Sequence, residues 1–351
     1  MLFLVAGILI FIYIYKDLKF SKIQNAVSTL HYEWIVLSGV FGLLSHFIRA
    51  LRWNLLIEPL SHRPRVYNTY LSVLVLYLFN ILIPRGGEVA RCSVITRYEK
   101  IPFTKLLGTV VSERLADLVT FLLIVGVLLA WDMSYFRRLI NNNQHLSWDI
   151  GAVGTGGLIA VGIMAIVIVA LVVIFKRSSS GSKFRSVVFK LLGQFREGVQ
   201  TIRGSRNKWL FILYTFLIIF LWLMMLYVVF FAYEPTSHLT FSTAVITFAI
   251  SSFAFLLPIQ AGLGAWHFIV IQCLFLFGVD MDHGAVFALV AHTFTNLVFL
   301  AAGTLAFMLL PVVNQRRVKK LSFKEMAARE EETPQTPWPA EESDHSNKTI
   351  D

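Results

Sequence analysis

Two stretches of this chain place charged side chains directly beside long apolar runs. One reads Pro84-Arg85-Gly86-Gly87-Glu88-Val89-Ala90-Arg91, and the other reads Ser112-Glu113-Arg114-Leu115-Ala116-Asp117. A charge at the centre of a membrane helix costs roughly 2.5–3.5 kcal/mol, so such residues pair with one another or line a wet cavity. Arginines in this setting could meet an anionic phosphate, while the carboxylates would orient them or bind a cationic group.

Two further arginines, Arg49 and Arg52, lie one helical turn apart in the apolar stretch 34–57. They could be positively charged anchors near the cytoplasmic end of a span. They could equally face a substrate, and the two roles are compatible.

The acidic pair Glu113 and Asp117 also lies one turn apart, with Arg114 on a neighbouring face. A salt-bridge lock with arginines of the earlier segments is the preferred interpretation of these acids, and direct contact with a substrate is the alternative. The arginines available for the lock are Arg49, Arg52 and Arg91.

The apolar sequence is broken twice by proline and glycine, first at Pro84, Gly86 and Gly87 and again at Pro258, Gly262 and Gly264. Proline removes a hydrogen-bond donor and glycine permits a positive φ, so backbone groups could face a ligand there. The helices that start after Gly87 and Gly264 would also present positive dipole ends.

Two polar residues of the second half complete the set of candidates for substrate binding. His267 follows the second break, and Asn296 lies near the middle of the last apolar run. Lone histidines on apolar faces more often pack than bind. The full set is Arg49, Arg52, Arg85, Glu88, Arg91, Glu113, Arg114, Asp117, His267 and Asn296.

The composition is that of a polytopic helical membrane protein. Apolar residues make up 56% of the chain and charged residues 15%, and the mean hydropathy is +0.68. The formal net charge of +10 is explained by membrane topology and anionic lipid headgroups, and nucleic acid is not an expected partner. Two cysteines, Cys92 and Cys273, support neither a disulfide framework nor a metal site.

The apolar pattern predicts an all-α fold with about six full spans and two broken re-entrant hairpins, or about eight hydrophobic segments in total. The predicted spans are 1–15, 34–57, 104–131, 151–175, 209–231 and 284–310. The predicted hairpins are 66–84 with 88–99, and 241–258 with 265–277. Residues 1–315 would form the transmembrane domain, with a basic amphipathic helix at 184–203 on the membrane surface. Residues 316–351 would form a disordered cytoplasmic tail.

The two halves of the domain, about 1–131 and 151–310, share the order span, span, broken hairpin, span. Three spans per half would invert the second half relative to the first, and paired broken helices in inverted repeats point to a central transport site. The basic stretch 176–208 and the basic start of the tail would be cytoplasmic. This topology places Lys16, Lys19 and Lys22 on the opposite side.

The ordered motifs resemble the lysylphosphatidylglycerol synthase transmembrane region, a flippase-like family, over about residues 1–315. The motifs are Arg49-x-x-Arg52-Trp53, Pro84-x-Gly-Gly87-Glu88-x-x-Arg91, Glu113-Arg114-x-x-Asp117 and Pro258-x-x-x-Gly262-x-Gly264. The resemblance implies that fuller members carry a soluble lipid aminoacyltransferase or a glycosyltransferase. Neither is present here, so the synthase reaction is not carried over. His267 stands where the family often has an acidic residue.

Three functions follow as expectations. The first is a lipid translocator in the bacterial cytoplasmic membrane that moves an anionic or lipid-linked headgroup between leaflets. The second is a scaffold for enzymes of lipid or cell-envelope biosynthesis, which would be its partners. The third is a lipid-modifying enzyme, which is disfavoured because no Ser-His-Asp set, metal-ligand cluster or Walker lysine occurs. We therefore expect membrane lipids as the main partners, no cofactor and no enzymatic activity.

Overall fold

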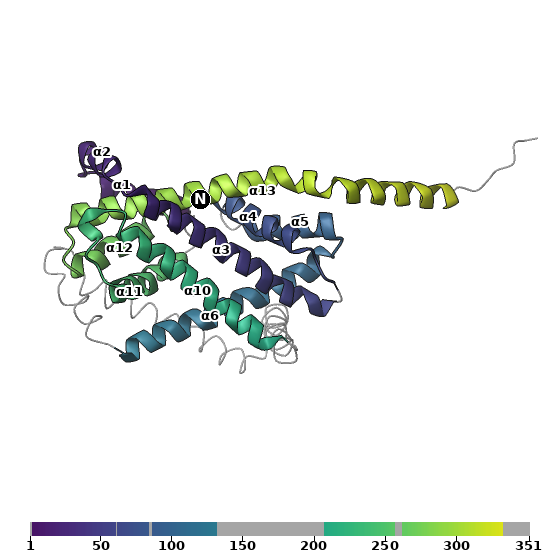
Figure 1. Cartoon of the computed structure of the whole chain (residues 1–351), viewed down its shortest axis with the longest axis horizontal. Coiled ribbons are helices and arrows are strands. Elements are labelled where there is room, and N and C mark those ends of the chain that lie inside the picture. The colour runs from purple at the N-terminus through teal and green to yellow at the C-terminus, as the bar shows by residue number, and fades with distance from the viewer. Residues whose placement is uncertain (1, 61, 84–85, 132–206, 257–261, 333–351) are drawn as a thin grey trace, which may run out of the picture. The chain divides into compact units, whose positions relative to one another are not determined.

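The computed structural model describes residues 2–60, 62–83, 86–131, 207–256 and 262–332. Within these ranges the chain is helical and no strand occurs (Figure 1). Three described helices are long and apolar enough to cross a membrane, at Tyr32–Leu60, Lys208–Phe230 and Met281–Gln315. The predicted all-α membrane protein is confirmed. The predicted span 151–175, the basic helix 184–203 and the residues Pro84, Arg85 and Pro258 lie outside the described residues.

The N-terminal segment forms two short helices, α1 (Leu2–Tyr15) and α2 (Phe20–Ser28). The sequence predicts α1, whereas α2 is found only in the structure. The Lys22 ammonium on α2 contacts the Asp282 carboxylate at the start of the last helix, and this hydrogen bond raises the pKa of Lys22. The lysine-rich segment after α1 therefore lies on the same side as the start of the last span, as the predicted topology requires.

The first hairpin consists of α4 (Val66–Leu82) and α5 (Gly87–Glu99), which pack against each other. At 1.5 Å per residue they are about 25 Å and 20 Å long, so each is shorter than a bilayer core of about 30 Å. The Arg65 backbone N–H donates to Glu99 Oε1 at 3.4 Å, and Asn68 Nδ2 donates to the same oxygen at 2.5 Å. The hairpin therefore ends beside the point where it begins, as a re-entrant hairpin does.

The second hairpin is built from α11 (Phe241–Ser251), the 3₁₀ turn η3 (Ser252–Leu256) and α12 (Ala265–Leu276). Both of its helices are shorter than those of the first hairpin, and they contact each other. Tyr233, which precedes the hairpin, has its hydroxyl 2.7 Å from Nδ1 of His283, which follows it. This hairpin also returns to the side from which it starts.

Two long helices, α3 (Tyr32–Ile57) and α10 (Lys208–Phe230), form the most extensive helix–helix contact among the described elements. A short 3₁₀ turn, η1 (Glu58–Leu60), extends α3. Ser38 Oγ donates to the Met225 carbonyl at 2.9 Å, and Arg52 Nη1 donates to Thr215 Oγ1 at 3.2 Å. Residue numbers thus rise along α3 as they fall along α10, so the helices are antiparallel. Equivalent helices of inverted halves are expected to run this way.

The glycines of the two breaks act mainly through close packing. Gly87 has a helical backbone, and a Cβ there would lie 2.2 Å from the Leu76 carbonyl oxygen. Gly264 has φ +79°, and a Cβ there would lie 2.4 Å from the Gly7 carbonyl oxygen of α1. Gly86 has φ −70°, so the expectation of positive φ is wrong at the first break and right at Gly262 and Gly264. At the first break glycine is needed because α4 and α5 touch backbone to backbone.

The last two long helices are α6 (Phe103–Trp131) and α13 (Met281–Glu332). The chain divides into two compact units, Met1–Met308 and Leu309–Asp351. Residues 316–332 are helical where the sequence predicted a disordered tail. This stretch is rich in Lys, Glu, Ala and Arg and contains no proline or glycine, so its local helix propensity is high.

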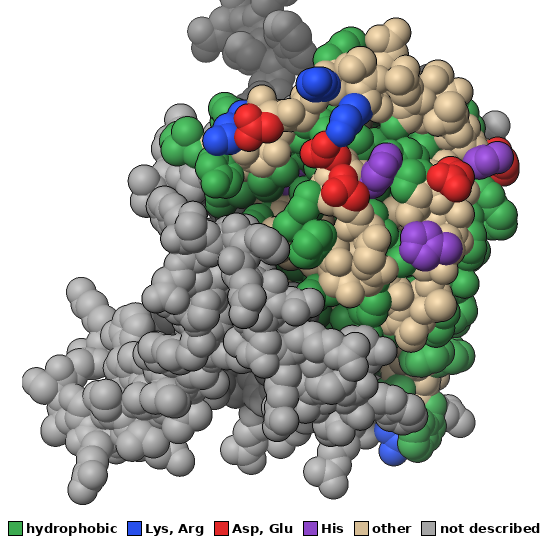
Figure 2. Space-filling model, turned by 90° about the vertical axis from the view of Figure 1, so that its left-hand side faces the viewer, with side chains coloured by type: hydrophobic (Ala, Val, Ile, Leu, Met, Phe, Trp, Pro, Cys, Tyr) green, Lys and Arg blue, Asp and Glu red, His purple; other side chains and the backbone are tan. Residues whose placement is uncertain are grey.

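Figure 2 shows one face of the molecule, at the end where α2 and α12 lie. Charged side chains gather in one region of this face, and hydrophobic side chains cover much of the rest of the coloured surface. Large side chains such as Leu9, Phe20 and Trp209 are exposed. Exposed apolar surface of this kind suits a protein surrounded by lipid.

Candidate functional site

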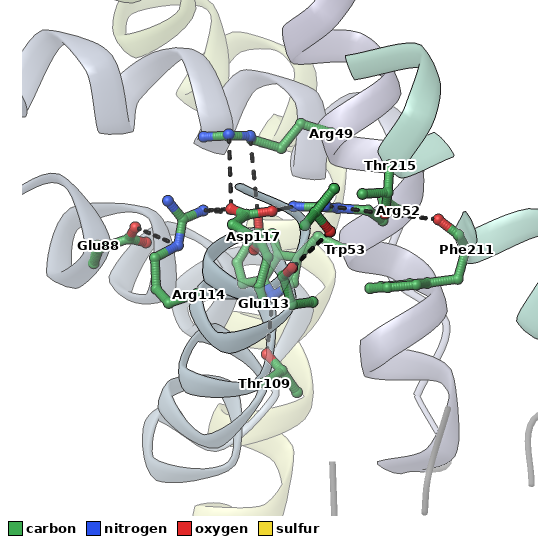
Figure 3. A network of polar contacts seen from close by, with 12 residues as sticks. Arg49, Arg52, Trp53, Glu88, Thr109, Glu113, Arg114, Asp117, Phe211 and Thr215 are labelled. Atoms are coloured by element: carbon green, nitrogen blue, oxygen red, sulfur yellow. Dashed lines mark hydrogen bonds and ion pairs between the residues drawn. The ribbon is translucent and has the colours of Figure 1, made fainter. Parts of the chain in front are cut away.

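Four arginines and three carboxylates from α3, α5 and α6 meet in one polar network (Figure 3). Arg49 and Arg52 lie one turn apart on α3, so both reach the same side of that helix. The network contains Arg49, Arg52, Arg91, Arg114, Glu88, Glu113 and Asp117, which we call the arginine cluster. The predicted pairing of Glu113 and Asp117 with arginines of the earlier segments is therefore found in the structure, and Arg85 lies outside the described residues.

Glu113 is the centre of the arginine cluster. Its Oε1 lies 3.1 Å from Arg52 Nη2 and 2.9 Å from Arg114 Nη2, and its Oε2 lies 2.8 Å from Arg91 Nη2. Glu113, Arg52 and Arg91 all have side chains with no exposed surface. Because each helix contributes one member of this group, the contacts fix α3, α5 and α6 relative to one another.

The outer part of the cluster is open to the surface. Arg114 is 41% exposed, and Asp117 and Glu88 are about a quarter exposed. Arg114 Nη2 lies 3.2 Å from Asp117 Oδ2, and its Nε lies 3.5 Å from Glu88 Oε1. A ligand that approached from this side would therefore meet Arg114 first.

The cluster carries more positive than negative groups. Four guanidiniums and three carboxylates leave a formal charge of +1. Arg52 Nε and Arg91 Nη1 are also buried without a hydrogen-bond or ion-pair partner among the residues that the structure describes. Buried donors without partners are rare in native proteins, so these two nitrogens call for an acceptor beyond the described residues, such as a bound water or a ligand.

Neutral side chains hold the buried arginines in place. Trp53 Nε1 donates to Thr109 Oγ1 at 2.9 Å, and the Arg91 guanidinium lies 4.4 Å from the centre of a Trp53 ring. On the other side Arg52 donates to Thr215 of α10 and lies 5.5 Å from the Phe211 ring. Trp53 belongs to the motif Arg49-x-x-Arg52-Trp53, but its contacts with Thr109 and Arg91 could not be predicted from the sequence. Thr109 and Thr215 give no signal of their own in the sequence.

Tyr77 of α4 is a member of the candidate site that the sequence did not predict. Arg49 Nη1 donates to its hydroxyl at 2.7 Å, and its ring stacks on His46 with ring centres 3.8 Å apart. A hydroxyl-bearing aromatic residue inside the apolar run 66–83 was the available signal. Tyr77 connects the arginine cluster to the next feature.

An apolar cavity of about 190 Å³ lies next to Tyr77. Several aromatic side chains line it, and α10 and α13 supply most of its lining residues. Asn296 lines this cavity and does not join the arginine cluster, and its Nδ2 donates to the His292 carbonyl at 2.8 Å.

His267 is placed away from the arginine cluster, at the start of α12. Its side chain is fully buried, and its Nδ1 accepts the Gly264 N–H at 3.3 Å. Its ring packs on Phe11 and Tyr15 of α1, with ring centres 5.3 Å and 5.8 Å away. The start of α12 is thus covered by α1, so the expected backbone site after Gly264 is closed in this structure.

No group of three or more His, Cys, Asp or Glu side chains in the described part of the chain has the arrangement to hold a metal ion. The carboxylates of the arginine cluster instead form ion pairs with guanidiniums. Such an arrangement of guanidiniums and carboxylates is suited to the recognition of charged groups.

Comparison with known proteins places the chain among membrane proteins. The family described as Lysylphosphatidylglycerol synthase TM region matches residues 1–303. The chain is similar to the UPF0104 membrane protein MJ1595 of Methanocaldococcus jannaschii, with 27% identity over 152 residues. That match covers 41% of this chain and 44% of the relative, so the chain spans less than half the length of the curated relative it matches. No solved structure matches.

Proposed function

We propose that this chain, which belongs to the Lysylphosphatidylglycerol synthase TM region family of integral membrane proteins, is a lipid translocator. Its substrate would carry an anionic headgroup such as a phosphate, whose geometry guanidiniums match through paired hydrogen bonds. The cytoplasmic membrane of a bacterium is the location that this proposal assigns.

The observation that carries the proposal is the arrangement of charge in the arginine cluster. A purely structural lock does not need a member that is open to the surface. Here the buried centre of Arg52, Arg91 and Glu113 is complemented by an exposed guanidinium at Arg114 and by an excess positive charge. The buried centre supports the fold, and Arg114 is available to a headgroup.

The re-entrant hairpins support the same proposal. Helices too short to cross the bilayer end inside it, and a polar headgroup could be accommodated at such an interruption. The N-terminal turn of α5 carries Glu88, which is paired with Arg91 at 2.6 Å. A phosphate near this turn would compete with Glu88 for the guanidiniums of Arg91 and Arg114.

A reconstitution experiment tests the proposal. The full chain is placed in liposomes that contain phosphatidylglycerol labelled with a fluorophore on the headgroup, and exchange between leaflets is followed by quenching from outside. Arg114→Gln should slow the exchange strongly, whereas Arg63→Gln should leave it unchanged. Arg63 is the matched control because its side chain is 85% exposed and its ion pair with Glu58 lies outside the cluster.

The scaffold function predicts the opposite pattern. Its partners would contact the surface of the protein, so deletion of residues 321–351 would abolish function while Arg114→Gln would have no effect. Wild-type protein that does not accelerate exchange in any lipid mixture containing anionic phospholipid would contradict the translocator proposal.

A further inference from the structure

The cavity beside Tyr77 is large and is connected to the surface of the protein. Its volume of about 190 Å³ exceeds that of an apolar cavity of about 150 Å³ that admits a benzene molecule. Phe255 lines this cavity and is 50% exposed, so the lining continues to the surface of the protein. In a membrane, the molecules that would meet such an opening are lipid chains.

One wall residue carries a hydrogen-bond donor without a partner. Trp222 lines the cavity, and its Nε1 is buried without an acceptor among the residues that the structure describes. Buried indole N–H groups usually find a partner. Because this nitrogen has almost no accessible surface, the indole has to turn before its N–H can meet an acceptor inside the cavity.

Tyr77 lies between the cavity and the arginine cluster and contacts both. Its ring lines the cavity, and its hydroxyl accepts from Arg49. The guanidinium carbon of Arg49 lies 5.9 Å from the centre of the same ring. An amphiphile with its charge on the arginine cluster would therefore have its apolar part within reach of the cavity.

We propose that the cavity binds a hydrocarbon chain of a membrane lipid, and that the Trp222 indole turns on binding so that its Nε1–H donates to an ester oxygen of that lipid. The proposal rests on the proposed function, because it assigns the chain and the headgroup of one lipid to adjoining sites. It adds a subsite in the second half of the protein, whereas the arginine cluster belongs mainly to the first.

Photocrosslinking tests this assignment. The full chain is reconstituted with phosphatidylglycerol that carries a diazirine midway along one acyl chain, and labelled residues are identified by mass spectrometry. We expect labelling at Met225, which faces the cavity from α10. Labelling at Leu213, which is 49% exposed on the same helix, measures contact with bulk lipid. The ratio of the two yields reports occupancy of the cavity.

Two variants with matched controls decide the outcome. Ser252→Phe fills the cavity and should reduce the ratio to the background level, while Ser242→Phe places the same side chain on the exposed face of α11 and should not change it. Trp222→Phe keeps a ring but removes the donor, and it should lower lipid occupancy by about threefold to tenfold. Trp209→Phe is its control, because Trp209 is 74% exposed on α10.

Absence of labelling at Met225, or an equal ratio in Ser252→Phe and Ser242→Phe, overturns the cavity assignment. If Ser252→Phe does not fold, the comparison of Trp222→Phe with Trp209→Phe decides in its place. The same liposomes report headgroup exchange, so the two proposals fail separately. Cavity labelling without exchange would overturn only the translocator, and exchange without cavity labelling would overturn only the chain subsite.

Discussion

The Arg65 backbone amide and the Glu99 carboxylate are hydrogen-bonded at 3.4 Å, although they stand at opposite ends of the α4–α5 hairpin. This contact requires both ends of the hairpin to lie on the same side of the membrane. Tyr233 and His283 make the equivalent connection across the second hairpin at 2.7 Å. The two hairpins are thus closed by polar contacts at their bases.

Cysteine labelling should confirm this topology. In a background without Cys92 and Cys273, single cysteines at Arg63 and Lys100 should react with a membrane-impermeant maleimide from one side. Single cysteines at Ser237 and Asp282 should react from the other side, because Tyr233 and His283 hold the base of the second hairpin together. Labelling of Arg63 and Lys100 positions from opposite sides would show that the first hairpin crosses the membrane.

The two acids of α6 should differ in their effect on stability. Glu113→Gln removes the buried centre of the arginine cluster and leaves Arg52 and Arg91 without their shared carboxylate, at a cost of roughly 3–5 kcal/mol. Asp117→Asn should cost less, about 1–3 kcal/mol, because Asp117 is 28% exposed and its amide can still accept from Arg52. Thermal unfolding in detergent measures both. Equal melting temperatures for the two variants would contradict the assignment of a buried centre.

Substitution of glycine by alanine should separate packing from backbone freedom. In Gly87→Ala the new methyl group would meet the Leu76 carbonyl and the Asn80 side chain, so α4 and α5 must move apart and the protein should be destabilised. In Gly108→Ala the new methyl group on α6 would meet no described atom within 4 Å apart from the backbone of its own helix, so this variant should stabilise the protein by about 0.5–1 kcal/mol. Melting temperatures that shift in opposite directions are expected, and a neutral Gly87→Ala would contradict the close contact.

The contact between Trp53 and Thr109 should be measurable by a double-mutant cycle. Trp53→Phe removes the indole donor while keeping an aromatic ring beneath Arg91, and Thr109→Val removes the acceptor. The coupling free energy should be about 0.5–1.5 kcal/mol, as for a typical buried hydrogen bond. Additive effects of the two substitutions would mean that this bond does not stabilise the fold. Chemical denaturation in a mild detergent provides the four free energies of unfolding.

Much of the fold could be predicted because membrane helices have a strong local signal. The bounds expected for the helices around residues 34–57, 88–99 and 104–131 agree closely with α3, α5 and α6. The association of Glu113 with the arginines followed from the cost of an isolated charge in an apolar environment. Local sequence and charge pairing together therefore identified the arginine cluster.

What could not be predicted depends on contacts between distant segments. The packing of α1 over the start of α12 makes His267 a buried structural residue, and nothing near His267 in the sequence encodes that contact. The hydrogen bond from Arg49 to the Tyr77 hydroxyl likewise joins α3 to α4, and nothing near Tyr77 in the sequence predicts it. The sequence predicted that Gly87 provides backbone freedom. In the structure Gly87 instead allows close contact with the backbone of another helix, and that contact also joins separate segments.

The order in which the ribosome synthesises the buried charged residues affects how the protein inserts into the membrane. Arg52 and its partner Glu113 are 61 residues apart, so the ribosome makes the base well before the acid. At about 5–20 residues per second the interval is roughly 3–12 s. During this time the guanidiniums of α3 must stay in contact with water, lipid headgroups or the insertion machinery. Helix α3 can reach its final depth only when α6 arrives, which couples insertion of the first half to its completion.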